Sequence, residues 1–174
     1  MLTADLKKTI REVPDFPKPG INFYDLTTLF LNPEAFRSAV DRMVERYRGE
    51  KLTAIVGIES RGFVLGSVMA LELGVGMVLA RKPGKLPADT EKEDYELEYG
   101  QATLEIHRDA VGPEDRVLVV DDLLATGGTA AASGRLVERL GARVEGYAFL
   151  VELSFLKGRE QLGSANVFSL LQYD

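Results

Sequence analysis

The segment with the most chemical content runs from residue 117 to residue 129 and reads Val-Leu-Val-Val-Asp-Asp-Leu-Leu-Ala-Thr-Gly-Gly-Thr. Its apolar first part is typical of a strand buried in a parallel sheet, and that strand leads to the adjacent carboxylates of Asp121 and Asp122. The small residues that follow allow main-chain N–H groups to close around an anion at the start of a helix, with two threonine hydroxyls as further donors. These residues are Ala125, Thr126, Gly127, Gly128 and Thr129.

The two carboxylates indicate what lies beside that anion. Asp121 and Asp122 repel a phosphate, but carboxylates accept hydrogen bonds well from vicinal hydroxyls. A phosphate on one side and a diol on the other describe a ribose 5-phosphate. The alternative interpretation is that these acids and glycines only cap a helix and form an ordinary turn.

Two other phosphate-binding motifs do not fit the glycines of this chain. A Walker loop needs a lysine after its last glycine, whereas Thr129 follows Gly128. Gly74 and Gly76 have the spacing of the first two glycines of a dinucleotide-binding fingerprint, but they precede a strand and the third glycine is missing. Both motifs are therefore excluded.

Composition removes several classes of function. Cysteine is absent and His107 is the one histidine, which excludes disulfide scaffolds, thiolate nucleophiles, Cys-ligated zinc, iron–sulfur clusters and His-rich metal sites. We expect His107 to be an ordinary strand residue. Twenty-one Lys and Arg against 27 Asp and Glu give a net charge of −6, so no global basic field is available for nucleic acid. A phosphate must therefore be bound locally.

The length of 174 residues fits one domain. The first residues are amphipathic and do not read as a signal peptide, and no apolar run approaches the roughly 18 residues of a membrane span. We therefore expect a cytoplasmic protein that binds no membrane.

Strand and helix patterns alternate along the chain. Helices are predicted at 32–48, 63–73 and from Thr129 to Leu140, and strands at 52–58, 77–80, 116–122, 144–153 and 167–170. This order predicts an α/β fold with a mainly parallel central sheet flanked by helices. Ligands bind beyond the carboxyl ends of such strands, where the polar turns 59–62 and 121–129 are expected.

One segment departs from this alternation. Six acids and one base lie between Ala88 and Glu98, and we expect a mobile or edge segment whose acids, from Asp89 to Glu96, are simply solvated. Period-2 alternation on both sides of Gly100 predicts a hairpin there.

These motifs carry a resemblance to a known family. Residues 121–129 resemble the phosphoribosyl-diphosphate binding motif of type I phosphoribosyltransferases, and the chain from about residue 13 to its end resembles the adenine phosphoribosyltransferase family. Residues 16–25 resemble the hood, 59–63 the first diphosphate loop, 81–87 the second, 98–107 the lid, and 151–160 the C-terminal region. The acidic stretch from Asp89 to Asp94 has no counterpart among these motifs.

The resemblance implies the type I phosphoribosyltransferase fold as a single domain over 1–174, with a hood formed by about 1–30 and a lid by about 86–106. It implies that adenine and 5-phosphoribosyl 1-diphosphate give AMP and diphosphate, with Mg²⁺ held mainly by substrate and water and no direct protein ligand assigned. It also implies a homodimer whose interface is close to the loops near Arg61 and Arg81.

Site residues follow from the same resemblance. Asp121 and Asp122 would hold the ribose hydroxyls and stabilise the positive charge that develops as the bond at C1′ breaks. Glu98 would be the acid–base residue at N7 of the purine, and Tyr99 would help to close the lid. The diphosphate would bind to Ser60, Arg61, Arg81, Lys82 and Lys85, with Arg61 also counted as catalytic. Adenine would bind to Asn22, Phe23, Tyr24 and Leu153, with Phe23 stacking on the ring.

Two alternatives remain open at this stage. A related transferase would use hypoxanthine, guanine or xanthine, although the hood segment 16–25 favours adenine. A sensor would bind the same ligand without turnover and regulate transcription, but the residues before Pro14 are too few for a DNA-binding domain.

Overall fold

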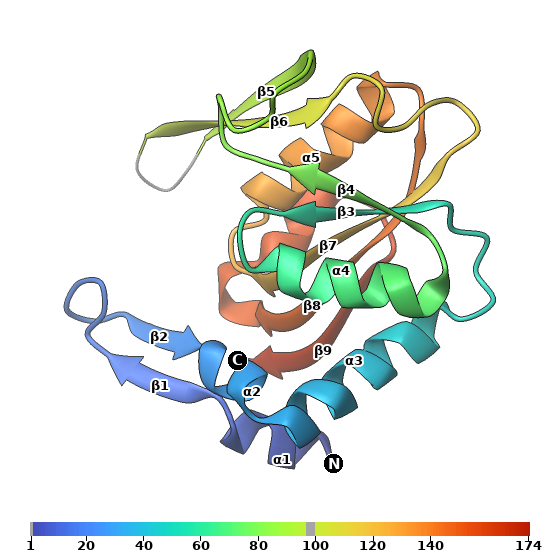
Figure 1. The fold of residues 1–174 in the computed structure, drawn as a ribbon. Coiled ribbons are helices and arrows are strands. Elements are labelled where there is room, and N and C mark those ends of the chain that lie inside the picture. The colour runs from blue at the N-terminus through green and yellow to red at the C-terminus, as the bar shows by residue number, and fades with distance from the viewer. Residues whose placement is uncertain (1, 97–99) are drawn as a thin grey trace.

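The computed structural model describes residues 2–96 and 100–174, and its centre is a five-stranded parallel sheet (Figure 1). The strand order is β4-β3-β7-β8-β9, and neighbouring strands pair in parallel throughout. The predicted α/β architecture with a parallel central sheet is therefore confirmed. The strands are β3 (Ala54–Ile58), β4 (Gly76–Ala80), β7 (Arg116–Leu124), β8 (Arg143–Leu153) and β9 (Val167–Tyr173).

Three long helices cover the two faces of this sheet. Helices α3 (Pro33–Tyr47) and α4 (Gly62–Leu73) lie on one face and α5 (Gly128–Arg139) on the other (Figure 1). The Asn32 side chain accepts hydrogen bonds from the N–H groups of Glu34 and Ala35, as expected for an N-cap. Gly74 ends α4 in the left-handed conformation, with φ of +69°.

The central strands alternate between two apolar clusters. Leu118 and Val120 pack with α3 and α4, whereas Val117 and Val119 pack with α5. Successive side chains of a strand point to opposite faces, so a continuous apolar run supplies both cores at once. This is why the strand segment of residues 117–120 carries no polar residue.

The N-terminal residues form a small unit at one end of the sheet. It contains α1 (Thr3–Lys8), the antiparallel pair of β1 (Arg11–Pro14) and β2 (Asn22–Asp25), and α2 (Thr27–Leu31). The β1–β2 hairpin projects beyond the sheet near the C-terminus (Figure 1). Tyr24 of β2 and Tyr173 of β9 join the two parts, with ring centroids 4.1 Å apart.

A second hairpin lies over α5. Its strands are β5 (Thr90–Glu96) and β6 (Gln101–His107), which pair antiparallel (Figure 1). The predicted hairpin is confirmed, but the prediction that its acids are simply solvated is wrong. Glu91 and Glu93 are only partly exposed, because one face of β5 packs on α5 and pairs with its arginines.

Two further predictions concern strand residues. His107 closes β6, where its Nε2 accepts a hydrogen bond from the Ala88 N–H at 3.4 Å, so it is a strand residue as expected. Strand β7 continues to Leu124, two residues beyond the predicted end at 122, because the longer β8 still pairs there, and the turn predicted at 121–129 therefore begins only after Leu124. Two short 3-10 helices, η1 (Ser154–Leu156) and η2 (Gly158–Leu162), follow β8. Among the residues described, no helix is long and apolar enough to cross a membrane.

Candidate active site

The carboxyl ends of β4, β3 and β7 meet at one edge of the sheet, because these strands are neighbours and run in parallel. The three strand ends carry charged side chains of both signs. A cavity of about 300 Å³ opens between them. It is lined by Glu59, Ser60, Arg61, Lys82, Asp121, Asp122 and Leu123. The fold thus brings five of the predicted site residues to one cavity.

Arg61 and Asp122 form an ion pair across this cavity, from the guanidinium Nε to the carboxylate Oδ2. The side chain of Asp122 is only 5% exposed, whereas that of Arg61 is 44% exposed. The Arg61 guanidinium carbon also lies 6.0 Å from the centroid of the Phe23 ring. Three segments that the sequence assigned to ribose, diphosphate and base therefore meet at one guanidinium.

Asp121 is partly exposed beside the buried Asp122. Burial and the negative charge of Asp122 raise the pKa of Asp121 well above its ordinary value. Its Oδ1 accepts a hydrogen bond from the main-chain N–H of Asp122 at 2.8 Å. A methyl group on Gly62 would come within 2.8 Å of this oxygen, so α4 can begin here only with glycine. The close approach explains the glycine that follows Arg61.

Glu59 is a site residue that sequence reasoning did not select. Burial opposes its ionisation, but the N–H of Lys82 at 2.9 Å and the Arg81 guanidinium hold the pKa of Glu59 below its usual range. Arg81 also donates to the main-chain oxygen of Lys85 at 3.2 Å. Lys82 lines the cavity, but Lys85 does not. The signal for Glu59 was its place at the start of the polar turn after β3.

The glycine-rich segment forms a tight turn between β7 and α5. A small cavity of about 80 Å³ lies over it, lined by Asp121, Leu123 to Ala130 and Phe149. Gly127 occupies the left-handed region with φ of +86° and caps α5. The first N–H groups of an α-helix have no partner within the helix and favour an anion. The geometry therefore agrees with the predicted anion-binding loop.

This loop is braced by a segment that the sequence did not assign to the site. A methyl group on Gly158 would overlap the main-chain oxygen of Ala125, and one on Gly127 would overlap the oxygen of Gly158. The next residue, Arg159, donates from Nε and Nη2 to the two carboxylate oxygens of the buried Glu152, each at 2.7 Å. Two backbones are thus in direct contact. The sequence feature that could have indicated this contact is the pair Gly158-Arg159.

Of the four predicted base-binding residues, three lie on β2 and the fourth, Leu153, ends β8. Phe23 is half-buried, points toward Arg61 and contacts Phe16 edge-on, with ring centroids 5.2 Å apart. Tyr24 packs with Leu153 in the apolar cluster beneath. The Asn22 side chain donates to Glu12 at 2.8 Å. Phe23 is therefore the ring of this set that lies near Arg61, which lines the cavity. Glu98 and Tyr99 lie outside the described residues.

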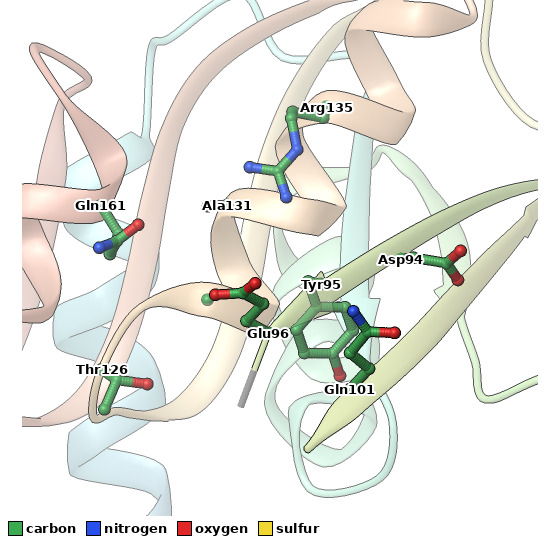
Figure 2. A pocket seen from close by; sticks show the side chains of 9 residues that line it. Asp94, Tyr95, Glu96, Gln101, Thr126, Ala131, Arg135 and Gln161 are labelled. Atoms are coloured by element: carbon green, nitrogen blue, oxygen red, sulfur yellow. The ribbon is translucent and has the colours of Figure 1, made fainter. Parts of the chain in front are cut away.

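A larger cavity, of about 570 Å³, lies between the β5–β6 hairpin and the start of α5 (Figure 2). Figure 2 shows side chains of the hairpin on one side and those of α5, the loop and η2 on the other. The lining residues are Asp94, Tyr95, Glu96, Gln101, Thr126, Gly128, Ala131, Arg135 and Gln161. The anion-binding loop is thus accessible from the hairpin side as well.

The chain is similar to known proteins over most of its length. The model of the phosphoribosyl transferase domain matches residues 28–162. The adenine phosphoribosyltransferase of Anaeromyxobacter dehalogenans is 57% identical over 168 residues, which cover 97% of this chain and 98% of that protein.

The chain is also similar to solved structures of adenine phosphoribosyltransferases. The adenine phosphoribosyltransferase of Thermoanaerobacter pseudethanolicus has a TM-score of 0.96 at 48% identity, with 99% of this chain and 100% of that chain covered. The Saccharomyces cerevisiae enzyme, solved with D-2,5-dideoxy-2,5-imino-altritol 1,6-bisphosphate and adenine, has a TM-score of 0.91 at 46% identity, with 97% and 98% covered.

The raised pKa of Asp121 gives a prediction for stability. Asp121→Asn removes the negative charge that Asp122 repels but keeps an oxygen for the Asp122 N–H, so we expect the melting temperature at pH 7.5 to rise by about 2–4 °C, which corresponds to about 1 kcal/mol. A carboxyl with a raised pKa destabilises the fold while it is ionised. The difference should therefore shrink as the pH falls through that pKa and the wild-type group becomes neutral. Thermal unfolding at pH 7.5 and at pH 5 measures the rise in melting temperature and its dependence on pH, and Asp109→Asn, at an exposed position, is the control. A melting temperature of Asp121→Asn below that of wild type at pH 7.5 would contradict this prediction.

The contact between the two backbones gives a second prediction. Gly158→Ala should force Ala125 and the anion-binding loop apart, costing about 1–3 kcal/mol of stability and weakening the binding of inorganic phosphate about tenfold. Gly112→Ala is the matched control, because nothing lies within 4 Å of a methyl group there. Calorimetric titration with phosphate and thermal unfolding test the pair. Equal phosphate affinity in both variants would show that the contact does not shape the loop.

Proposed function

Because the chain belongs to the phosphoribosyl transferase family, and within it to the adenine phosphoribosyltransferases, we propose that the rim of charged strand ends is its active site. The enzyme transfers the 5-phosphoribosyl group of 5-phosphoribosyl 1-diphosphate to adenine, giving AMP and diphosphate, a reaction of purine salvage. The observation that carries the site assignment is the guanidinium of Arg61, which lines the cavity, pairs with Asp122 and lies 6.0 Å from the centroid of the Phe23 ring.

We assign the 5-phosphate to the turn from Ala125 to Thr129 and the ribose hydroxyls to Asp121 and Asp122. The small cavity over the turn and the start of α5 support the first assignment. The second is supported by two carboxylates at the neighbouring cavity. As the bond between C1′ and diphosphate breaks, the ribose gains positive charge, which the same carboxylates stabilise.

We assign the diphosphate to Arg61, which follows β3, and to Arg81 and Lys82, which follow β4. Ser60 is a further donor, and Lys85 is a more distant cation. Arg61 and Lys82 line the cavity, and Arg81 braces the loop of residues 81–85 by donating to the main-chain oxygen of Lys85. In the free protein Arg61 is held by Asp122 and Arg81 by Glu59. The arriving anion would therefore share these guanidiniums with the carboxylates, which keeps the cations ordered before substrate binds.

For the base, we propose that Phe23 stacks on adenine, while main-chain groups of Asn22 and Tyr24 contact its edge and Leu153 covers the other face. We keep Glu98 as the acid–base residue at N7 and Tyr99 as the lid residue that closes the site. The unit from α1 to α2 would be the hood and the β5–β6 hairpin the lid of one domain. Closure excludes water, which could otherwise attack the ribose.

We propose that Mg²⁺ assists the reaction, bound chiefly by substrate oxygens and water. Within residues 2–96 and 100–174 there is no group of three or more His, Cys, Asp or Glu side chains that could hold a metal ion, which suits an ion carried by the substrate. The repulsion that raises the pKa of Asp121 would be relieved by a cation nearby. When bound, Mg²⁺ would neutralise charge on the diphosphate.

We also propose a homodimer, formed through α4 and β4. Helix α4 is apolar on its outer side as well as its inner side, and Val64 and Leu71 are exposed there. Leu79 is exposed on β4, the edge strand of the sheet, close in sequence to Arg81. An apolar helix face beside an open sheet edge suits a second copy of the chain. The cytoplasmic location expected from the sequence stays a prediction.

The reaction is tested with the purified chain, phosphoribosyl diphosphate and Mg²⁺, with adenine, hypoxanthine, guanine and xanthine offered separately. We expect AMP and diphosphate from adenine alone. Arg61→Ala and Asp122→Asn should each lower kcat/KM at least about 100-fold with unchanged circular dichroism. Wild-type rates in both variants would remove them from the site. Absence of product with every base, with phosphoribosyl diphosphate still bound, would favour the sensor.

The homodimer is tested by light scattering after size-exclusion chromatography. Leu71→Asp places a charge in the proposed interface, and we expect it to convert the dimer to a monomer at micromolar concentration. Leu31→Asp is the matched control, because Leu31 and Leu71 are 83% and 81% exposed and Leu31 lies on α2. A wild-type monomer, or a dimer that survives Leu71→Asp but not Leu31→Asp, would contradict this interface.

A further inference from the structure

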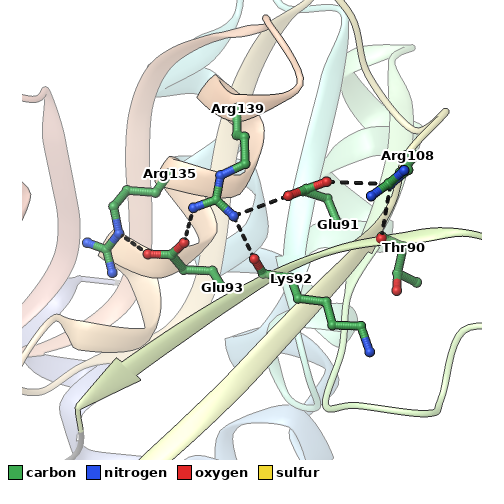
Figure 3. Close-up of polar contacts among 7 residues, drawn as sticks. All are labelled: Thr90, Glu91, Lys92, Glu93, Arg108, Arg135 and Arg139. Atoms are coloured by element: carbon green, nitrogen blue, oxygen red, sulfur yellow. Dashed lines mark hydrogen bonds and ion pairs between the residues drawn. The ribbon is translucent and has the colours of Figure 1, made fainter.

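The acidic strand β5 and helix α5 carry opposite charges that pair in reverse chain order. Glu91, Glu93 and Tyr95 are the less exposed residues of β5, and they alternate with exposed ones. Arg135 and Arg139 lie one turn apart on α5, and both point to this strand (Figure 3). The hairpin therefore meets the helix through one charged face, which we call the clasp: Glu91, Glu93, Arg135 and Arg139.

The contacts of the clasp are specific. Glu93 binds Arg135 with one carboxylate oxygen and Arg139 with the other (Figure 3). Arg139 also reaches Glu91 at 3.3 Å and the main-chain oxygen of Lys92 at 2.6 Å. Beyond the clasp, Arg108 binds Glu91 at 3.5 Å and the main-chain oxygen of Thr90 at 3.2 Å. The side chains and the main chain of β5 are both held.

Repeat distances explain why the pairs match. Two residues of a strand span about 6.6 Å and four residues of a helix about 6.0 Å. Glu93 can therefore face Arg135 while Glu91 faces Arg139, and the same step brings Tyr95 to the first turn of α5. A slip by one strand residue would turn both acids away from the helix, because successive side chains of a strand point to opposite faces. The clasp thus fixes which face of β5 meets the helix.

Burial makes the clasp more than a surface ion pair. The Glu93 side chain is only 12% exposed. Burial opposes its ionisation, but the two guanidiniums hold the pKa of Glu93 below its usual range. The other face of β5 has its own partners, Lys92 with Glu105 at 2.8 Å and Asp94 with Thr103 at 2.6 Å. Lys92 and Asp94 therefore do not compete with the arginines of α5 for Glu91 and Glu93.

This arrangement places the end of β5 against the anion-binding loop. A methyl group on Gly128 would lie 3.1 Å from the main-chain oxygen of Glu96 and 3.7 Å from Cδ2 of Tyr95. The 570 Å³ cavity is bounded by these two residues and by Thr126 (Figure 2). Arg135 lines the same cavity while it binds Glu93. Helix α5 therefore connects the anion-binding loop, at its first turn, to the two arginines of the clasp.

We propose that Glu91, Glu93, Arg135 and Arg139 are positioning residues, whose ion pairs hold Tyr95 and Glu96 against the loop and thereby complete the site for the 5-phosphate of phosphoribosyl diphosphate. This inference rests on the proposed function for its substrate. It does not place the four side chains on the reacting atoms. Their contribution acts through the shape of the loop and its hairpin wall.

Charge reversal tests the clasp. Glu93→Arg and Arg135→Glu should each raise the KM for phosphoribosyl diphosphate about fivefold to tenfold, with the KM for adenine within twofold. The double reversal should recover part of the loss, because the contact between residues 93 and 135 is restored while residue 93 then carries the same charge as Arg139. Arg37→Glu is the matched control, since Arg37 pairs with Glu72 between α3 and α4 at 3.3 Å, away from the loop. The control should leave both KM values unchanged.

Binding of ribose 5-phosphate, measured by calorimetry, gives a readout that needs no turnover. We expect its Kd to rise in parallel with the KM in the single variants, and Glu93→Gln provides a milder change if a reversal does not fold. A lower melting temperature with unchanged Kd and KM would overturn the proposal and leave the clasp a purely structural contact. If wild type binds ribose 5-phosphate but makes no AMP, the proposed function fails and the Kd series alone decides on the clasp.

Discussion

The ion pair between Arg61 and Asp122 is the interaction around which the site is arranged. It joins the ends of β3 and β7, and its guanidinium lies under the ring of Phe23 from the N-terminal unit. Asp122 is buried, so its charge needs a partner, and Arg61 supplies one while staying open to the cavity. Because β4 is next to β3, a second pair, Arg81 with Glu59, lies beside the first. An acidic protein thus holds several cations at one place without an excess of positive charge.

Close contact between main chains is the second constraint on the site. The loop from Ala125 to Gly127 is held on one side by Gly158 and on the other by the end of β5 near Gly128. Such contacts require glycine, since a side chain would take the space of the opposite backbone. Arg159 and the buried Glu152 anchor the Gly158 side, and the clasp anchors the β5 side. The loop is therefore shaped by its neighbours as much as by its own sequence.

Helix α5 connects these constraints. Its first turn borders the loop, its third and fourth turns carry Arg135 and Arg139, and its inner face packs in the apolar cluster with Phe149. Movement of the hairpin along this helix would change the wall of the cavity that reaches the loop. The acids Glu91 and Glu93 of β5 join the hairpin to this helix through their ion pairs with Arg135 and Arg139.

Much of this protein is determined by local sequence. The apolar run before Asp121, the glycines after it, the cap at Asn32 and the stop at Gly74 depend on neighbouring residues, so the helices, the parallel sheet and the loop could be predicted. The pairing of charged side chains could not be predicted. Arg61 and Asp122 are 61 positions apart, and only the strand order brings them together. The acids of β5 looked solvated in sequence, because the arginines that bind them lie 42 to 48 positions away on α5. Such pairs depend on register and packing, which the tertiary structure alone decides.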